Sequence, residues 1–559
     1  MKFVSTGGQS PATDLRTALT AGLAADGGLY LPERIDPIDA SLLAELNGQS
    51  FSAVSRAVAG HLLGSLIPAA DLDRIVDTAL DFEVPLVAQG DDVHLLELFH
   101  GPTLAFKDVG ARFMAQLLGY LGTEGGDPLT ILAATSGDTG SAVAQAFLGV
   151  PGLGTVILFP KGKVTDLQER QFTTLGGNVR VLEVDGTFDD CQRLVKSAFS
   201  DPLLSDAIRL TSANSINIGR LLPQIFYYVH AAAQLPRGSA PIFSVPSGNF
   251  GNLTAGLMAK KLGVATRGFV AATNVNDVVP EYLLSGVLSP RPSIPTISNA
   301  MDVGDPSNFA RILALYEGDL DHLRKDLVGS VHNDDETRDC IAQVYERTGY
   351  VLDPHSAVGY LGVEAGCRAF GEGSCVALCT AHPVKFREAV EPAVGSEVPV
   401  PECLAACLQA ERHVTSIPTE MSALRDFLLA DLRTGLAELL FTEPEAFREL
   451  RRVVEPHHTP GDVFTQDRAL LEGLRRSTPS KPHVVEVGVL VDDEIAADTA
   501  FIVASTGLID RLIHETREVV GENLSRSSVI FLRNPAVAEV GVLGPASPGP
   551  HTEASMVSP

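Results

Sequence analysis

Basic residues, cysteines and long apolar runs are all scarce in this chain of 559 residues. Lysine and arginine number 42 against 69 aspartate and glutamate residues, which leaves a formal net charge of −27. Binding to nucleic acid or to anionic lipid needs a positive field, so we expect neither kind of partner. No run of about 18 apolar residues is present, and we therefore expect no membrane-spanning segment. A site for an anionic substrate must then be locally basic against an acidic background.

The seven cysteines are too few and too scattered for a disulfide scaffold, and their odd number is typical of reduced thiols in the cytosol. Cys375 and Cys379, like Cys403 and Cys407, have a spacing that could suggest metal. Small buried hydrophobes are the commoner explanation, so we expect no metal site. The first residues, MKFVSTGGQS, lack the apolar stretch of a signal peptide, which favours a cytoplasmic protein.

The middle of the chain has a regular pattern. From about residue 95 to residue 400, short apolar strands alternate with Gly-rich turns and amphipathic helices. The expected strands include Leu129–Thr135, Thr155–Phe159, Val179–Val184, Ile242–Pro246 and Gly268–Thr273. This alternation predicts an α/β fold in which helices cover both faces of a parallel sheet. Ligands then bind outside the C-terminal ends of the strands, where the Gly-rich turns lie.

The regions around this core differ in texture. We expect residues 1–94 to be helical and turn-rich, and residues 401–430 to form a helical end of the core. Residues 431–545 predict a small appended α/β module of unknown role, with a helix at Glu494–Val520. Its expected strands are Val484–Val491, Ser528–Leu532 and Val537–Leu543. His457-His458 in this module is more typical of a polar linker than of metal ligands. Residues 546–559 are rich in Pro, Ser and Gly and predict a disordered tail.

The most informative segment is ELFHGPTLAFKDVGARF, which runs from Glu97 to Phe113. Lys107 stands here between Phe106 and Asp108, in a largely apolar stretch just before a predicted helix. Apolar surroundings disfavour the charged form of lysine, so the amine becomes a nucleophile toward an aldehyde. A lone lysine would more simply be a surface residue at a helix end, but three further segments accompany this one.

The first of these is the turn Pro246-Ser-Gly-Asn-Phe-Gly-Asn252, between an expected strand and an expected helix. Glycine permits close backbone approach, and a helix start offers unpaired N–H groups and a positive dipole end. This combination favours phosphate, although the patterns GxGxxG and GxxxxGK[ST] are both absent. The second is the donor-rich turn Ser136-Gly-Asp-Thr-Gly140, which could hold a carboxylate or simply cap a helix. The third is CTAHPVKF, in which Thr380 follows an apolar strand.

Together these segments resemble the threonine synthase family, which are pyridoxal-phosphate (PLP) enzymes of the tryptophan-synthase-β structural group. The likeness runs from about residue 4 to about residue 430 and includes HGPTLAFKD, TSGDTGSA, FPKGKVTDLQERQ, NSINIGRLLPQ, SVPSGNFGN, SNAMDVGDPSN and TAHPVKF. So many segments in one order make chance agreement implausible. The resemblance implies a two-lobed core of parallel or mixed sheet around a central cofactor. It departs at the N-terminus, where many members have Ser-Thr-Arg-Gly but Thr6 is followed here by Gly7-Gly8, which leaves site closure and substrate preference open.

The resemblance also implies roles for individual residues. Lys107 would form the Schiff base with PLP, and Thr380 would bond the pyridine nitrogen, leaving it largely unprotonated. Asp138 occupies a position that is often Asn and contacts the ring hydroxyl. The residues expected to cradle the cofactor phosphate are Gly248, Asn249, Phe250, Gly251 and Asn252. Ser136 and Thr139 would hold the substrate carboxylate.

The implied substrate is O-phospho-L-homoserine, which gives L-threonine and phosphate by γ-elimination of phosphate and β-addition of water. Candidates for the substrate phosphate are Lys161, Lys163, Ser215, Asn217 and Arg220. Two alternatives stay open: a PLP-dependent phospholyase acting on a related phospho-amino acid, and a non-catalytic ligand-binding derivative. We expect a small-molecule substrate and a monomer or homodimer.

Overall fold

The computed structural model describes residues 1–90, 92–122, 128–135 and 137–429, and the short strands β14 to β18 beyond them. The chain divides into two compact units. The first unit comprises Met1–Cys191 and Leu210–Ser416, and the second comprises Gln192–Arg209 and Ile417–Pro559. Among the described residues, no helix is long and apolar enough to cross a membrane.

The larger sheet of the first unit has six strands in the order β11-β10-β9-β12-β4-β3. Their bounds are β3 (Leu86–Ala88), β4 (Val93–Glu97), β9 (Ile242–Pro246), β10 (Gly268–Thr273), β11 (Leu327–Val331) and β12 (Cys375–Cys379). All pairs are parallel except β3 with β4, which is antiparallel at the edge. The central strands β9, β10 and β12 are buried at every residue, because helices cover both faces of a parallel sheet.

A smaller sheet has the order β13-β7-β6-β5-β8. Its strands are β5 (Leu129–Ala134), β6 (Leu153–Pro160), β7 (Val179–Val184), β8 (Arg209–Thr211) and β13 (Thr415–Ile417). The three central strands β5, β6 and β7 run parallel. A short antiparallel pair, β1 (Phe3–Ser5) with β2 (Tyr30–Pro32), lies near the N-terminus.

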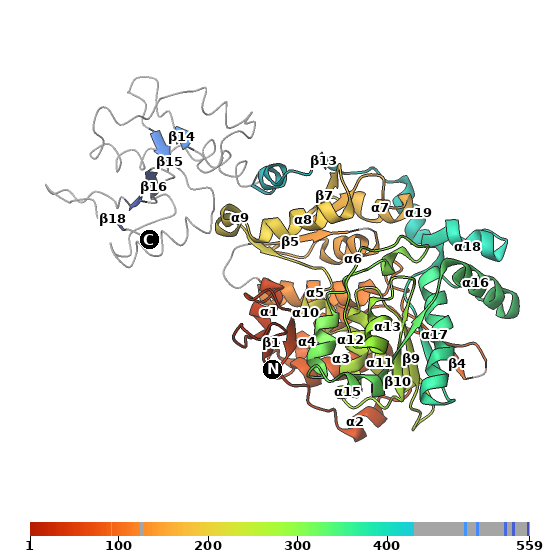
Figure 1. Cartoon of the computed structure of the whole chain (residues 1–559). Helices are drawn as coiled ribbons and strands as arrows, with labels where there is room; N and C mark the ends of the chain where they lie inside the picture. Colours follow the sequence, from red (N-terminus) through yellow and green to blue (C-terminus); the bar gives the residue numbers. More distant parts are fainter. Residues whose placement is uncertain are drawn as a thin grey trace. The chain divides into compact units, whose positions relative to one another are not determined.

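Helices connect and cover these strands (Figure 1). Their bounds are α1 (Leu15–Ala21), α2 (Ala40–Glu45), α3 (Phe51–Leu63), α4 (Ala69–Ala79), α5 (Lys107–Gly122), α6 (Asp138–Phe147), α7 (Asp166–Thr173), α8 (Phe188–Phe199), α9 (Pro202–Ala207), α10 (Ile218–Leu221), α11 (Gln224–Gln234), α12 (Gly251–Lys261), α13 (Val278–Ser285), α14 (Phe309–Leu315), α15 (Leu320–Asp326), α16 (Asp334–Thr348), α17 (Pro354–Phe370), α18 (Arg387–Val394) and α19 (Glu402–Gln409), with 3-10 turns η1 (Asn299–Met301) and η2 (Pro383–Phe386).

Aromatic packing sets the position of helix α12 against the larger sheet. Phe243 of β9 and Phe269 of β10 stack with ring centroids 5.6 Å apart, and Tyr228 of α11 meets Phe243 edge-on at 5.1 Å. A Cβ on Gly256 of α12 would lie 2.7 Å from the Phe269 ring and 2.8 Å from the Tyr228 ring. The absence of a side chain at Gly256 therefore lets α12 approach β9 and β10 closely, which places the turn before α12 at the end of β9.

The structure confirms the α/β class and most expected strands. Val179–Val184, Ile242–Pro246 and Gly268–Thr273 have the expected bounds, whereas the strand expected at Thr155–Phe159 is longer, at Leu153–Pro160. Two boundaries differ from expectation. The segment 401–430 is not helical throughout, because residues 415–417 pair with β7 as strand β13. Region 1–94 contains β3 and the start of β4, which are edge strands of the larger sheet.

Beyond residue 430 the described residues form two short sheets. Strands β14 (Glu486–Gly488), β16 (Ile530–Arg533) and β17 (Glu539–Val542) fall on or next to expected strands. Strand β15 (Thr499–Phe501) pairs with β14 inside the stretch expected to be helical, and β18 (Met556–Val557) pairs with β17 inside the expected disordered tail. The remainder of the expected module, including His457-His458, lies outside the described residues.

Candidate active site

Lys107 is the first residue of α5 and comes directly after a backbone segment held against strand β12. Phe106 N donates to Thr380 O at 2.8 Å, and Ala105 forms a β-bridge with Ala381. Leu104 has a left-handed backbone, with φ of 57°. A left-handed non-glycine residue is uncommon and persists where surrounding contacts hold it, as they do here. The side chain of Lys107 is 15% exposed.

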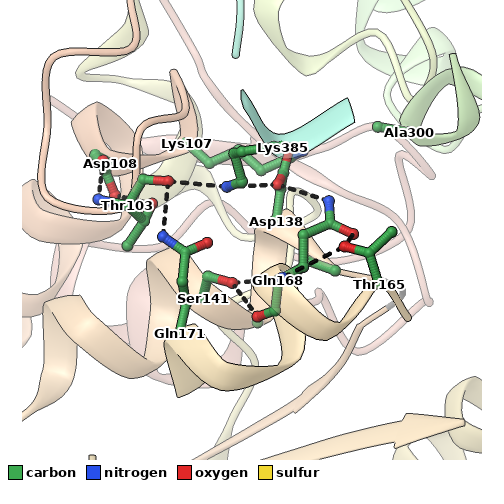
Figure 2. Close-up of polar contacts among 12 residues, drawn as sticks. Thr103, Lys107, Asp108, Asp138, Ser141, Thr165, Gln168, Gln171, Ala300 and Lys385 are labelled. Carbon is green, nitrogen blue, oxygen red and sulfur yellow. Dashed lines mark hydrogen bonds and ion pairs between the residues drawn. The ribbon is translucent and has the colours of Figure 1, made fainter. Parts of the chain in front are cut away.

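One carboxylate faces two lysines at this point (Figure 2). Asp138 Oδ2 lies 3.5 Å from Lys107 Nζ, and Asp138 Oδ1 lies 2.6 Å from Lys385 Nζ. Gln168 Nε2 also donates to Asp138 Oδ1, at 2.9 Å. Asp138 is the first residue of α6, so the helix dipole also favours its negative charge.

Burial and the two opposed charges shift the pKa values in this cluster. Burial lowers the pKa of Lys107, the Asp138 charge opposes this, and the charges of Lys385 and Arg220 add to the lowering. Burial alone would raise the pKa of Asp138, but the charges of Lys385 and Lys107 outweigh it and hold that pKa well below its usual range. The arrangement therefore keeps Asp138 ionised and increases the free-amine fraction of Lys107.

Lys385 is fully buried and is held by a second contact. Its Nζ donates to Thr103 O at 2.8 Å, and Gln171 Nε2 donates to the same oxygen at 3.2 Å. Thr103 in turn donates through N and Oγ1 to Asp108, at 2.9 and 2.5 Å (Figure 2). Burial raises the pKa of Asp108, although these hydrogen bonds oppose the rise. Hydrogen bonds to Lys385 and to Asp108 therefore hold Thr103, the last residue of the turn HGPT (residues 100–103), in place.

The Gly-rich turn after β9 has the features that a phosphate requires. A Cβ on Gly248 would lie 2.7 Å from Ala300 O, so only glycine fits this close backbone approach. Phe250, just before α12, is left-handed with φ of 62°. Within the described part of the chain, no acceptor meets the backbone N–H groups of residues 248–252. Unpaired N–H groups at the start of an 11-residue helix favour an anion.

Thr380 comes directly after β12 and is 6% exposed. Its carbonyl accepts from Phe106 N, and its N–H donates to Ser356 Oγ at 3.3 Å. Ser356 lies at the start of α17, where Asp353 caps the helix. These contacts place Thr380 beside the segment that carries Lys107. A largely buried amine with lowered pKa and a set of free N–H groups after β9, the strand paired in parallel with β12, fit a phosphate-bearing aldehyde such as PLP.

The structure brings together only part of the expected substrate-binding set. Ser215 Oγ accepts from Asn249 Nδ2 at 2.6 Å, beside the Gly-rich turn. Arg220 is 3% exposed and near enough to Lys107 to lower its pKa. The Arg220 Nε has no partner among the residues described. Thr139 lies next to Asp138 in α6, whereas Ser136 is outside the described residues.

Three other expected residues have positions that do not favour a substrate contact. Asn217 caps α10. Its Nδ2 donates to Leu19 O and Ser212 O, and its Oδ1 accepts from Gly219 N, so this side chain stabilises the fold. Lys161 is exposed and lies 3.8 Å from Glu183, and Lys163 is exposed. Substrate-binding roles for these three residues stay predictions.

Sequence reasoning missed several residues of this site. Lys385 belongs to the motif TAHPVKF, but nothing in that motif indicates that this lysine is buried and paired with Asp138. Gln168 and Gln171 lie on α7 and reach Asp138 and Thr103 only through the fold. Thr135 Oγ1 accepts from Gly137 N and Gly140 N and so fixes the turn before α6. Gln168 and Gln171 could have been proposed from the sequence, because both lie in FPKGKVTDLQERQ, a segment that carries the family resemblance.

Comparison with known proteins first defines the class. The chain matches the family described as "Pyridoxal-phosphate dependent enzyme" over residues 83–381, which contain the Lys107 cluster and the Gly-rich turn. It is therefore a PLP-dependent enzyme. Residues 2–80 match "Threonine synthase N terminus" and residues 356–428 match "Threonine synthase, C-terminal". The chain belongs to the threonine synthase family.

Individual relatives agree with this assignment. The chain is 44% identical to a threonine synthase of Serratia marcescens over 433 residues, which are 77% of this chain and 99% of that protein. It is 43% identical to a threonine synthase of Escherichia coli, with 77% and 99% covered. Among solved structures, the E. coli threonine synthase matches with a TM-score of 0.72 and 42% identity, covering 77% of this chain and all of that one. A PLP-bound threonine synthase of Brucella melitensis matches with a TM-score of 0.73 and 39% identity, covering 77% and 98%.

Proposed function

We propose that this chain converts O-phospho-L-homoserine and water to L-threonine and inorganic phosphate. The observation that carries the proposal is the largely buried Lys107, whose pKa is lowered and whose Nζ lies 3.5 Å from Asp138. The relatives named threonine synthase, at 43–44% identity over nearly their whole length, support the choice of reaction.

We assign the cofactor contacts by residue. Lys107 would be the attachment point for the cofactor aldehyde, and the N–H groups of Gly248, Asn249, Phe250, Gly251 and Asn252 would hold its phosphate. Thr380 would offer the ring nitrogen a neutral hydroxyl, and Asp138 would contact the ring hydroxyl. When bound, PLP supplies a conjugated electron sink that stabilises negative charge at the substrate carbons.

Proton transfer falls to Lys107. The substrate protons at Cα and Cβ are far too weakly acidic for an unaided side chain, but beside the electron sink an amine of lowered pKa can take them. In the overall reaction the Cγ–O bond breaks and its electron pair leaves with phosphate. A hydroxyl from water is added at Cβ, while Cα and Cγ gain protons. Lys107 Nζ also returns these protons.

The two ends of the substrate need different partners. Thr139, and Ser136 with the neighbouring amides, bind the carboxylate at the start of α6. Ser215 and Arg220 are the favoured partners of the leaving phosphate, because Ser215 adjoins the Gly-rich turn and Arg220 is a buried cation near Lys107. A developing dianion in a water-restricted site requires such donors.

Product analysis tests the proposal. Purified holoenzyme incubated with O-phospho-L-homoserine should release threonine and phosphate in equal amounts, and Lys107→Ala should release neither. Formation of 2-oxobutyrate and ammonia in place of threonine would instead identify a phospholyase. Absence of turnover with cofactor bound would favour a non-catalytic derivative.

We also propose that the enzyme acts in the cytoplasm as a monomer or homodimer, without nucleic acid or membrane as a partner. The net charge of −27 supports this, since it repels polyanions. Sedimentation of the purified chain, alone and with DNA or anionic vesicles, tests it: co-sedimentation with either would overturn the proposal.

A further inference from the structure

A buried arginine near the Gly-rich turn has no carboxylate partner among the residues that the structure describes. Arg311, on α14, is fully buried. Its guanidinium donates to Tyr30 O at 2.8 Å, Ile216 O at 2.7 Å, Asn308 Oδ1 at 2.6 Å and Ser215 O at 3.4 Å. All four acceptors are neutral, and burial lowers the pKa of Arg311 to about 9. An uncompensated buried charge is costly, so its retention calls for an anion within its field.

The residue that Arg311 contacts has an unused donor. Asn308 is fully buried, and its Oδ1 accepts from Arg311 Nη1. A guanidinium only donates, so this contact fixes which end of the Asn308 amide is oxygen. The remaining Nδ2 group has no partner among the residues that the structure describes. A buried N–H group without a protein acceptor is rare and calls for an acceptor at this place.

The unused donor faces the start of α12. A Cβ on Gly251, the first residue of that helix, would lie 3.5 Å from Asn308 Nδ2 and 3.9 Å from Ser215 Cβ. Asn249 ties the same segments together, because its Nδ2 donates to Ser215 Oγ and its Oδ1 accepts from Ser307 N, both at 2.6 Å. Asn308 Nδ2 and the unpaired N–H groups of the Gly-rich turn therefore lie together at the start of α12.

We propose that Asn308 Nδ2 donates to the phosphate of PLP, and that Arg311 is a positioning residue which orients this amide and whose charge favours the phosphate dianion. This deepens the proposed function, since it rests on the cofactor phosphate lying at residues 248–252. It gives the motif SNAMDVGDPSN a role in cofactor binding. The phosphate of the substrate could accept the same hydrogen bond, and the test distinguishes it from the phosphate of PLP.

The first experiment compares two aldehydes on the cofactor-free full-length protein. Affinity for PLP and for pyridoxal, which lacks the phosphate, is measured for the wild type and for Asn308→Asp. The variant should lose about ten- to a hundredfold in PLP affinity, as expected for a lost hydrogen bond to a charged group and a new repulsion. Its pyridoxal affinity should be unchanged. Asn333→Asp, at the cap of α16, adds the same charge elsewhere and should change neither affinity.

The second experiment examines the phosphate itself. Phosphorus NMR of the bound cofactor should show that the phosphate pKa rises in Arg311→Met, while Arg311→Lys, which keeps the charge, restores part of the difference. Asn308→Ala serves as a milder variant if Arg311→Met fails to fold.

Three outcomes would overturn the inference. Equal loss of pyridoxal and PLP affinity would mean that Asn308 is merely structural. If Asn308→Asp has an unchanged PLP affinity but a raised KM for O-phospho-L-homoserine, Asn308 contacts the substrate phosphate instead. An unshifted phosphate pKa in Arg311→Met would remove the role of Arg311. The PLP and pyridoxal affinities and the phosphate pKa are measured without turnover, so the inference and the proposed reaction fail separately.

Discussion

Lys385 Nζ lies 2.6 Å from one oxygen of Asp138, while Lys107 Nζ lies 3.5 Å from the other oxygen (Figure 2). Two ammonium groups thus compete for one buried carboxylate. The cluster carries one more positive than negative charge when both lysines are protonated, and burial favours the loss of a proton. Lys385 has the shorter contact and a second acceptor, Thr103 O, while burial lowers the pKa of Lys107 and favours its neutral form.

Removing Lys385 should therefore change the protonation of Lys107. In Lys385→Met, Asp138 pairs with Lys107 alone, and a positive neighbour that lowers the Lys107 pKa is gone. We expect the pH dependence of PLP attachment to move to higher pH. Stability should fall by about 3–5 kcal/mol, because a buried ion pair is broken. Lys161→Met, which removes an exposed lysine 3.8 Å from Glu183, is the matched control and should change neither property.

Lys107→Ala removes the amine itself. We expect loss of the long-wavelength absorbance of bound cofactor and at least about a hundredfold loss of turnover, since no other base replaces Nζ. Spectra of the reconstituted variant and assay of threonine check this. Unchanged activity would refute the role of Lys107.

Gly248→Ala tests the close approach at the Gly-rich turn. The added Cβ would meet Ala300 O at 2.7 Å and Met301 Cα at 2.8 Å, both backbone atoms that cannot move cheaply. We expect weaker PLP binding, measured by titration of the cofactor-free protein. Gly60→Ala in α3, where a Cβ meets nothing within 4 Å, should leave binding intact and stabilise the helix by about 1 kcal/mol. Equal binding by both variants would contradict the assigned cradle.

His230 should contribute a pH-dependent part of stability. Burial lowers its pKa to about 4, from an ordinary value of 6.5. Between these values the unfolded chain binds a proton that the folded chain does not, so the free energy of unfolding falls as pH drops through this window. The slope is at most about 1.4 kcal/mol per pH unit. Urea unfolding at pH 4 to 7 should show this slope, and His230→Phe should remove it. A slope that survives the substitution would assign it to other groups.

Truncation after residue 429 should retain PLP binding and threonine formation. The family matches together span residues 2–428, and the Serratia marcescens relative aligns over 99% of its own length with 77% of this chain. Activity of the shortened chain checks this. Loss of folding on truncation would instead show that the appended residues complete the fold.

Much of the fold followed from local pattern. Val179–Val184, Ile242–Pro246 and Gly268–Thr273 are short, largely apolar runs bounded by turn residues, and such runs are typical of buried parallel strands. Strand β13 was missed because three residues pair with β7 only through a contact distant in sequence. The strand β15 inside an expected helix is the same kind of error, since pairing with β14 overrides local preference.

The sequence by itself determined the kind of chemistry at this site. A lysine in an apolar turn, a Gly-rich strand-to-helix turn and a hydroxyl after a strand appear in the order that the family shares, and Lys107, Gly248 and Thr380 are recognisable without a structure. Only the tertiary structure decided how these residues are charged and held. Which helices and strands pack together decides that Lys385 is buried and contacts Asp138. The same packing leaves the amide group of Asn308 without a partner among the described residues. Burial and interatomic distance determine pKa values and hydrogen bonding, and neither burial nor distance can be predicted from a short segment of sequence.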